Sequence, residues 1–329
     1  MKKISLLCTC LFTLFTQAQT YTVDNKPNAT ANFSNLQTAI ETVPAGSTLL
    51  VQGSTTSYGT LTIEKRITIK GTGYFLSENP FTQAEFSSSK VGNIAFNEGA
   101  NGAIITGLDL DNNNGINLGN TSNITISNNR IGFIRGLVTT TSCLVINNFI
   151  YYRFSYYSNL GGSYSVYIGS GTTIVGNYIN GFVGGDNIEV KNNICSISSD
   201  AYDLEGSAVF NNVLMKIRYS NSSQYENTIY NNIYISSGSF DNNITVETLE
   251  ELFIDTTDSR YSSDGKYILK TGSVAIDAGV NGVDCGIFGG GYKLSGLPDI
   301  PNIYEFNVPT TGYTNSSGLQ INIKVKSNN

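Results

Sequence analysis

The sequence Ile126-Ser127-Asn128-Asn129 is one copy of a phrase that decides the fold: an aliphatic residue, one variable residue and a pair of asparagines. Further copies occupy residues 145–148, 190–193, 209–212, 229–232 and 240–243, and Ile174-Val175-Gly176-Asn177 is a variant. The second asparagine falls at 129, 148, 177, 193, 212, 232 and 243, so the steps are 19, 29, 16, 19, 20 and 11 residues. A recurring period near 20 residues predicts a solenoid.

Each copy is too short to be a domain and too rich in Val, Ile and Tyr to be helical. Consecutive strand-rich coils must therefore stack to bury their aliphatic side chains. Asparagine suits the bend between two strands because it tolerates left-handed backbone angles and carries both amide donors and an acceptor. Stacked asparagines can hydrogen-bond along the axis as a ladder. We predict that Asn192, Asn193, Asn211, Asn212, Asn231 and Asn232 meet at one corner, with at least one of each pair buried.

Composition narrows the possible functions. The chain has 329 residues, 13% of them charged, with a formal net charge of −6 and no histidine. A Ser-His-Asp triad, a Cys-His dyad and a His-ligated metal site are therefore excluded. The acidic balance and the lack of a Lys/Arg run argue against nucleic acid as a partner.

Residues 1–18 read as a signal peptide. Lys2 and Lys3 precede an apolar run, and Thr16-Gln17-Ala18 is a small-residue cleavage site. The run is too short to span a bilayer, so we expect no transmembrane segment and a mature protein that is secreted, periplasmic or on the cell surface. Cleavage leaves Cys143, Cys195 and Cys285, and an odd number without CxxC spacing predicts buried, inert thiols rather than a disulfide framework.

The mature chain divides into three parts. Residues 19–47 form an N-terminal cap, because 34–43 carry a capping pattern and an apolar helical stripe that would cover the first coil. Residues 48–246 form a parallel β-helix, since 49–51, 61–63 and 67–69 read as three strands in one coil. Residues 247–329 form a C-terminal capping segment that ends in a hairpin of 303–308 and 319–325.

The first coil also carries a family resemblance. Leu36-Gln37-Thr38-Ala39-Ile40, Pro44-Ala45-Gly46-Ser47-Thr48 and the run Leu61-Thr62-Ile63-Glu64-Lys65-Arg66-Ile67-Thr68-Ile69-Lys70-Gly71 resemble the opening of bacterial secreted right-handed parallel β-helix proteins of the pectin lyase-like superfamily. The resemblance implies an all-β, right-handed parallel β-helix with an N-terminal helical cap and a C-terminal β cap. The family's Arg-x-Pro-x-x-Arg and Gly-His-Gly motifs are missing, so the resemblance identifies a fold and not a reaction.

Aromatic residues gather in the longest step of the repeat, between residues 151 and 167. Aromatic faces stack on sugar rings and phenol hydroxyls hydrogen-bond, which favours a glycan. The candidate substrate-binding residues are Tyr152, Tyr156, Tyr157 and Tyr202. The alternative is that these side chains pack on one another to cover the coil, since tyrosine is a good strand residue.

Charged residues cluster after this step. Asp200, Asp203 and Glu205 offer the oxygen ligands that Ca²⁺ prefers, and Lys191, Lys216 and Arg218 are candidate bases for a metal-assisted polysaccharide lyase. The alternative is a solvated charged face. We expect the three groups of charges to converge on one face, with Tyr152, Tyr156 and Tyr157 on the same side as Lys191, Lys216 or Arg218.

The sequence thus predicts a monomeric protein that binds an extracellular polysaccharide along its solenoid. A metal-assisted lyase is the first alternative, and a structural or adhesive surface protein is the second. A cleft in which carboxylates meet a lysine or arginine would favour the enzyme, whereas the structural alternative predicts no cleft.

Overall fold

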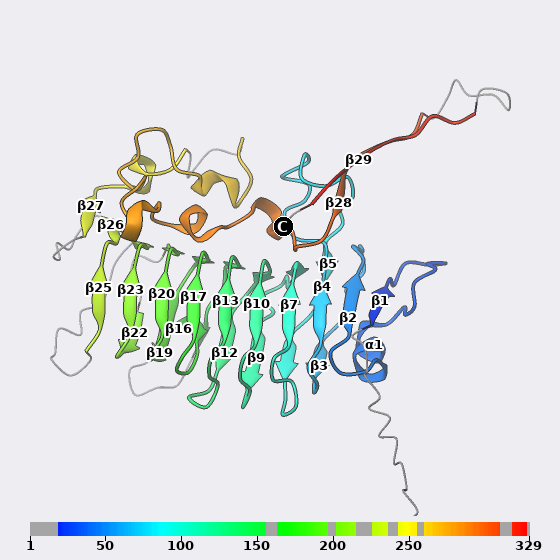
Figure 1. The fold of residues 1–329 in the computed structure, drawn as a ribbon, viewed down its shortest axis with the longest axis horizontal. Coiled ribbons are helices and arrows are strands. Elements are labelled where there is room, and N and C mark those ends of the chain that lie inside the picture. Colours follow the sequence, from blue (N-terminus) through cyan, green and yellow to red (C-terminus); the bar gives the residue numbers. More distant parts are fainter. Residues whose placement is uncertain are drawn as a thin grey trace, which may run out of the picture.

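A computed structural model describes residues 19–155, 163–196, 202–214, 226–235, 243–254, 260–309 and 318–327. The chain is a right-handed parallel β-helix, in which three long parallel sheets form the walls of a solenoid (Figure 1). In the coils between residues 125 and 205, the chain passes from the first sheet through an asparagine or glycine–asparagine corner to the second sheet, then to the third and back to the first. The fold expected from the repeat is therefore confirmed.

The first sheet contains ten strands. In spatial order they are β1 (Thr20–Val23), β2 (Thr48–Val51), β4 (Thr68–Lys70), β7 (Ile104–Thr106), β10 (Thr125–Ser127), β13 (Leu144–Ile146), β17 (Thr173–Val175), β20 (Glu189–Lys191), β23 (Ala208–Phe210) and β25 (Thr228–Tyr230).

The second sheet contains nine strands. They are β5 (Ser89–Lys90), β8 (Leu108–Asp109), β11 (Arg130–Ile131), β14 (Phe149–Ile150), β18 (Tyr178–Ile179), β21 (Ile194–Cys195), β24 (Val213–Leu214), β26 (Ile233–Ile235) and β27 (Ile244–Val246).

The third sheet contains seven parallel strands and a short eighth strand, β15 (Phe154–Ser155), which is antiparallel to one of them. The eight are β3 (Leu61–Ile63), β6 (Ile94–Phe96), β9 (Ile116–Gly119), β12 (Ile134–Gly136), β16 (Ser163–Tyr167), β19 (Phe182–Asp186) and β22 (Tyr202–Glu205) along the path, together with β15 off it.

Stacked aliphatic side chains fill the solenoid. In the first sheet, Ile105, Ile126, Val145, Ile174 and Val190 lie in register and are all buried. A strand turns alternate side chains to opposite faces, so the middle residue of each three-residue strand points inward. The aliphatic residue of each phrase is therefore the first sheet's contribution to a core that the inward residues of the other two sheets complete.

The asparagine corner is the ladder that the sequence predicts. The second asparagines 129, 148, 177, 193, 212 and 232 are fully buried, and each donates from its backbone N–H and its Nδ2 to Oδ1 of the next one at 2.7–3.2 Å, ending on Asn243. The first position of each pair is left-handed, with φ of 54° at Asn128 and 60° at Asn211, and glycine takes it at Gly107 and Gly176. The buried amides thus satisfy one another through the whole stack.

The N-terminal end is covered by α1 (Leu36–Thr42). Its buried Leu36, Ala39 and Ile40 join the core of the solenoid, and Asn35 caps it by accepting from Thr38 N at 2.8 Å. The first sheet begins one strand earlier than the sequence analysis placed it, because β1 pairs in parallel with β2.

The C-terminal segment runs back along the solenoid as a strap, which we define as residues 260–300. It contains the 3-10 helices η2 (Gly265–Tyr267), η3 (Val280–Gly282), η4 (Ile287–Gly290) and η5 (Leu294–Gly296), and follows η1 (Leu249–Glu251). The first asparagines of the ladder hold it: Asn231, Asn192 and Asn147 donate from Nδ2 to Ala278 O, Asp284 O and Gly291 O at 2.8–3.1 Å. Figure 1 shows this segment crossing from the last coils toward β4.

A second core forms beneath this strap. Phe149, Tyr178, Ile194, Val213 and Ile233 lie on the outer face of the second sheet and pack against Tyr267, Phe253, Cys285 and Ile287. Cys143, Cys195 and Cys285 are buried free thiols, as expected.

The C-terminal hairpin forms from β28 (Asn302–Asn307) and β29 (Asn322–Lys326) but lies away from the last coil. Ala84 N donates to Ile303 O at 2.8 Å, which fixes the hairpin beside the N-terminal coils (Figure 1). The hairpin expected from the sequence therefore forms, and it lies beside the N-terminal coils because the strap carries the chain back before the hairpin begins. No helix in the described ranges is long and apolar enough to cross a membrane.

Candidate functional site

The predicted site residues lie on different faces of the solenoid. Tyr152 is exposed and follows β14 of the second sheet, whereas Lys191 is in β20 of the first sheet. The expectation that these two share one side is therefore wrong. Tyr156, Tyr157, Lys216 and Arg218 lie outside the described residues, and Tyr202 belongs to β22 of the third sheet.

Lys191 is engaged in a local ion pair. Its Nζ lies 2.6 Å from Glu189 Oε1 and 5.7 Å from the centroid of the Phe210 ring, which in turn stacks on Tyr230 with centroids 5.0 Å apart. Rings stacked along the axis hide their faces between coils and turn only their edges outward. This row is suited to covering the sheet rather than to holding a sugar ring.

The candidate metal ligands do not form a described centre. Glu205 is exposed in the third sheet opposite Asp186, Asp203 belongs to the same strand β22, and Asp200 lies outside the described residues. The described ranges contain no group of three or more His, Cys, Asp or Glu side chains placed to hold a metal ion. The charges of 186–205 are divided between the first and third sheets, so the expected convergence on one face is wrong.

The structure brings a different set of charges together on the second sheet. Lys90, Asp109, Arg130 and Phe149 occupy consecutive coils in the same register. Each of these residues ends or begins a two-residue strand, so its side chain points out of the solenoid next to that of its neighbour. The result is a column of alternating charge followed by an aromatic ring.

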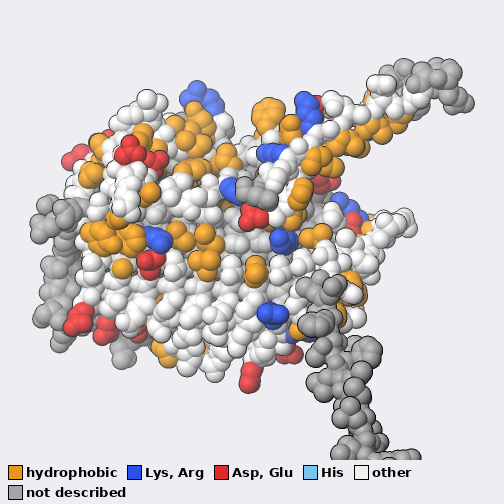
Figure 2. Space-filling model, in the orientation of Figure 1, with side chains coloured by type: hydrophobic (Ala, Val, Ile, Leu, Met, Phe, Trp, Pro, Cys, Tyr) orange, Lys and Arg blue, Asp and Glu red, His pale blue; other side chains and the backbone are white. Residues whose placement is uncertain are grey.

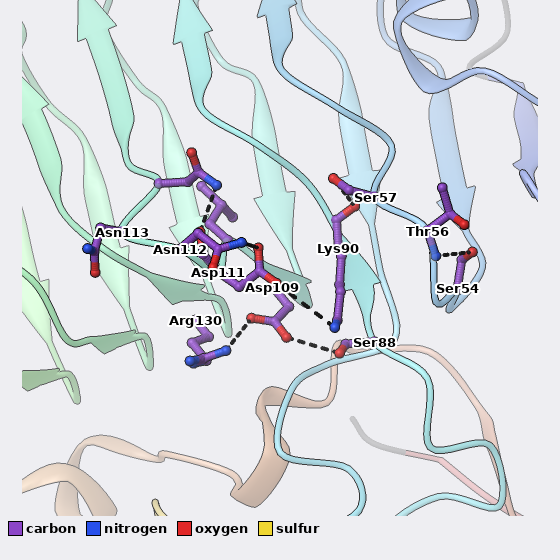
Figure 3. Close-up of polar contacts among 12 residues, drawn as sticks. Ser54, Thr56, Ser57, Ser88, Lys90, Asp109, Asp111, Asn112, Asn113 and Arg130 are labelled. Atoms are coloured by element: carbon purple, nitrogen blue, oxygen red, sulfur yellow. Dashed lines mark hydrogen bonds and ion pairs between the residues drawn. The ribbon is translucent and has the colours of Figure 1, made fainter.

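Asp109 is the buried centre of this column. Its Oδ1 accepts from Arg130 Nη1 and its Oδ2 from Ser88 Oγ, both at 3.0 Å (Figure 3). Burial raises the pKa of the Asp109 carboxyl, and the Arg130 guanidinium and the Ser88 hydroxyl oppose that rise. Both carboxylate oxygens are therefore occupied, which makes Asp109 an anchor for its neighbours.

Arg130 is held between two aromatic rings. Its guanidinium carbon lies 4.8 Å from the centroid of Tyr151 and 5.3 Å from that of Phe75. The Tyr151 hydroxyl donates to Leu110 O at 2.8 Å and accepts from Asn113 N at 3.1 Å, so the ring that covers Arg130 is itself fixed. Cation–π contacts on two sides leave the edge of the guanidinium to face the solvent.

These residues line a cleft of about 390 Å³, which we call the Arg130 cleft. Its walls are residues 54–55, 75–78 and 86–88, and its floor is Lys90, Asp109 and Arg130. Lys90 Nζ lies 3.9 Å from Asp111 Oδ2, beside the loop 111–114 (Figure 3). The cleft thus combines hydroxyls, paired charges and the rings of Phe75 and Phe86, the latter exposed at the rim.

The strap supports one wall of the cleft from outside. Tyr74 N donates to Ser295 O at 2.8 Å, and Ser263 N donates to Glu78 Oε2 at 2.6 Å. Behind them, the buried Asp264 accepts from Ser295 N at 2.7 Å and from Asn79 Nδ2 at 3.1 Å. Segments separated by more than 180 residues in sequence therefore build this site together.

Sequence reasoning missed the cleft although two signals were present. Asp109 and Arg130 are 21 residues apart, which is one coil, and residues 75–90 have few aliphatic side chains, which is typical of a loop that leaves the solenoid. Together these signals place a charged pair beneath a loop. The sequence-based prediction instead named the tyrosines between residues 151 and 167 and the charged residues that follow them.

Comparisons with known proteins found similar solved structures. No protein-family model and no curated protein matches the chain. Among solved structures, the crystal structure of pectate lyase Pel9A is similar at 14% identity and a TM-score of 0.42, covering 82% of this chain and 96% of that one. A crystal structure of a pectin methylesterase in complex with a hexasaccharide is similar at 11% identity and a TM-score of 0.29, covering 76% of this chain and 98% of that one.

Proposed function

We propose that the protein binds an extracellular polysaccharide through the Arg130 cleft. One observation carries the proposal: the outer face of the second sheet is covered by the strap over its later coils, and the column Lys90, Asp109 and Arg130 opens into a cleft at its earlier coils. A volume of about 390 Å³ with hydroxyls, charges and aromatic rings fits the requirements of a site for a small part of a polymer. The cleft also speaks against the purely structural alternative, which predicted none.

The charges of the cleft favour a neutral, hydroxyl-rich glycan. Lys90 and Arg130 face Asp109 and Asp111, and Glu78 adds a further carboxylate to the wall. Two cations and three carboxylates leave no positive excess to attract a uronate polymer. Sugar hydroxyls both donate and accept, so they can bond to paired charges without separating them.

The same geometry supports binding rather than a lyase reaction. The base of a lyase must lie within hydrogen-bond distance of the substrate proton that it removes, and its pKa must lie near the working pH. Arg130 is committed to Asp109, and Lys191 is committed to Glu189 on another face. Secretion after cleavage of residues 1–18 and a monomeric state complete the proposal, and N-terminal sequencing of the exported protein with sedimentation analysis tests them.

The test is a glycan-array screen of the mature chain followed by calorimetric titration of the best neutral ligand. Lys90→Ala and Phe86→Ala should each weaken binding about tenfold, because each removes a charged hydrogen-bond donor or an exposed ring from the cleft. Lys191→Ala, on the first sheet, is the matched control and should bind like the parent.

Two results would contradict the proposal. Equal binding by the parent and both cleft variants, all with unchanged melting temperatures, would place the glycan elsewhere. Release of unsaturated products from a uronate polymer, measured with and without Ca²⁺, would favour the lyase alternative.

A further inference from the structure

A second concave site lies at the N-terminal end, on the first sheet. A cavity of about 630 Å³ is bounded by β2 and β4 below, by the excursion residues 83–85, by the end of the strap at 297–301 and by β28 of the hairpin. None of its lining residues belongs to the Arg130 cleft. We call it the hairpin groove.

The hairpin groove has an apolar lining. Leu50, Val51, Leu297, Pro298, Ile300, Ile303 and Phe306 all contribute to it. Val51 and Leu297 are buried, whereas Ile303 and Phe306 are 43% and 53% exposed. Figure 2 shows hydrophobic side chains running along the projecting hairpin, which carries Ile303 and Phe306 of the groove. Such a surface gains free energy when an apolar molecule covers it.

The two charged residues of the groove are not equivalent. Glu85 Oε1 accepts from Ser87 N at 2.9 Å and its Oε2 lies 3.9 Å from Lys26 Nζ, so this carboxylate already has partners. Lys70 lies next to Leu50 in the register of the first sheet, on the same outward face. In the part of the chain that the structure describes, no carboxylate lies within 4.0 Å of Lys70 Nζ.

We infer that the hairpin groove binds an amphipathic small molecule with an aliphatic body and one anionic head group, such as a long-chain carboxylate. The aliphatic body lies along Leu50, Ile300 and Phe306, and the head group pairs with the Lys70 ammonium. An apolar cavity with one convergent charge is the common design of small-molecule sites, and the charge complementarity selects an anion.

The test uses displacement of a bound anilinonaphthalene sulfonate probe by three chains of equal length: dodecanoate, dodecanol and dodecyltrimethylammonium. We expect dodecanoate to displace the probe at about tenfold lower concentration than dodecanol, and the cationic chain to be weakest. Lys70→Gln should remove the difference between dodecanoate and dodecanol while both still bind. Ala84→Trp should fill the groove and abolish displacement by all three, and Lys266→Gln on the strap is the control that retains the parent order.

Three results would overturn the inference. The first is equal displacement by all three chains, and the second is a carboxylate preference that survives Lys70→Gln. The third is a concentration-dependent dimer in sedimentation analysis that Ala84→Trp disrupts, because a second copy would then be the occupant. The groove variants leave the Arg130 cleft untouched, so failure here is distinguishable from failure of glycan binding.

Discussion

The two asparagines of one ladder phrase should differ sharply in how well they tolerate replacement. Asn212 and Asn211 belong to the same coil, but Asn212 is a buried member of the ladder whereas Asn211 is the left-handed residue at the corner. The Asn212 Oδ1 accepts from Asn193 N at 2.9 Å and from Asn193 Nδ2 at 3.0 Å. Its Nδ2 donates at 2.9 Å to three buried or half-buried oxygens, those of Val190 O, Phe210 O and Asn232 Oδ1.

Asn212→Ala removes all five of these hydrogen bonds. The Asn193 N–H is left without its acceptor inside the solenoid, which costs about 1 to 3 kcal/mol. The remaining losses add about 1 kcal/mol each where the freed group finds no water. We expect the free energy of unfolding to fall by about 3 kcal/mol or more, which lowers the melting temperature by roughly 4 °C or more for a chain of this size.

Asn211→Gly should cost far less. Asn211 has φ of 60°, which glycine adopts without strain, and Gly107 and Gly176 already occupy this position in other coils. The variant loses the bond from Val280 N to Asn211 Oδ1 at 2.9 Å, worth about 1 kcal/mol. Asn211→Ala loses the same bond and adds about 1 to 2 kcal/mol for a left-handed alanine.

The assay is reversible urea unfolding followed by circular dichroism, with Asn123→Asp at an exposed left-handed turn as the control. The expected order of destabilisation is Asn212→Ala, then Asn211→Ala, then Asn211→Gly. An Asn211→Gly variant as unstable as Asn212→Ala would refute the division of labour, and so would an Asn212→Ala cost below about 1 kcal/mol.

Three further predictions follow from single contacts. Because burial raises the Asp109 pKa, the native protein takes up this proton at a higher pH than the unfolded chain does. The free energy of unfolding of the parent, relative to that of Asp109→Asn, should therefore rise as pH falls from 7 toward about 4. Urea unfolding at each pH measures this difference, and a difference that does not change with pH would contradict the prediction. Gly176→Asn should lower the melting temperature although it restores the repeat phrase, because its Cβ would lie 2.2 Å from Asn147 Oδ1; an unchanged melting temperature would show that the corner can open. Burial raises the pKa of the Cys285 thiol to about 12, so alkylation at pH 8 should label it only after unfolding.

The solenoid could be predicted because every coil repeats the same local solution. One aliphatic residue fills the core, one left-handed residue turns the corner, and one buried amide closes the ladder, so the period in the sequence is the period in space. The step of 29 residues between Asn148 and Asn177 keeps the same ladder contact, since Asn148 N donates to Asn177 Oδ1 at 2.8 Å.

The strap could not be predicted in the same way. Its contacts join residues as far apart as Tyr74 and Ser295, and several of them use backbone carbonyls that carry no sequence signal. The sequence predicts a capping segment at 247–329, and Asp284 within it bonds locally, accepting from Asp277 N at 3.0 Å. The sequence does not indicate that the strap runs back along the solenoid. Its bonds to the first asparagines use backbone carbonyls, which any residue type in the strap could supply.

The contrast between repeating and non-repeating contacts also explains why the repeat phrase does not predict the position of the Arg130 cleft. In a solenoid, a side chain that follows the repeat packs against a side chain of similar type one coil away. Phe210 stacks on Tyr230 in this way, which leaves no ring face open to a ligand between them. A binding site needs a place where the neighbour on the next coil is unlike. On the second sheet, Lys90, Asp109 and Arg130 are such unlike neighbours, and Phe75 and Ser88 reach them from the excursion 75–90. Functional positions in this fold are therefore best sought where a break in the period and a change of side-chain type coincide on one sheet.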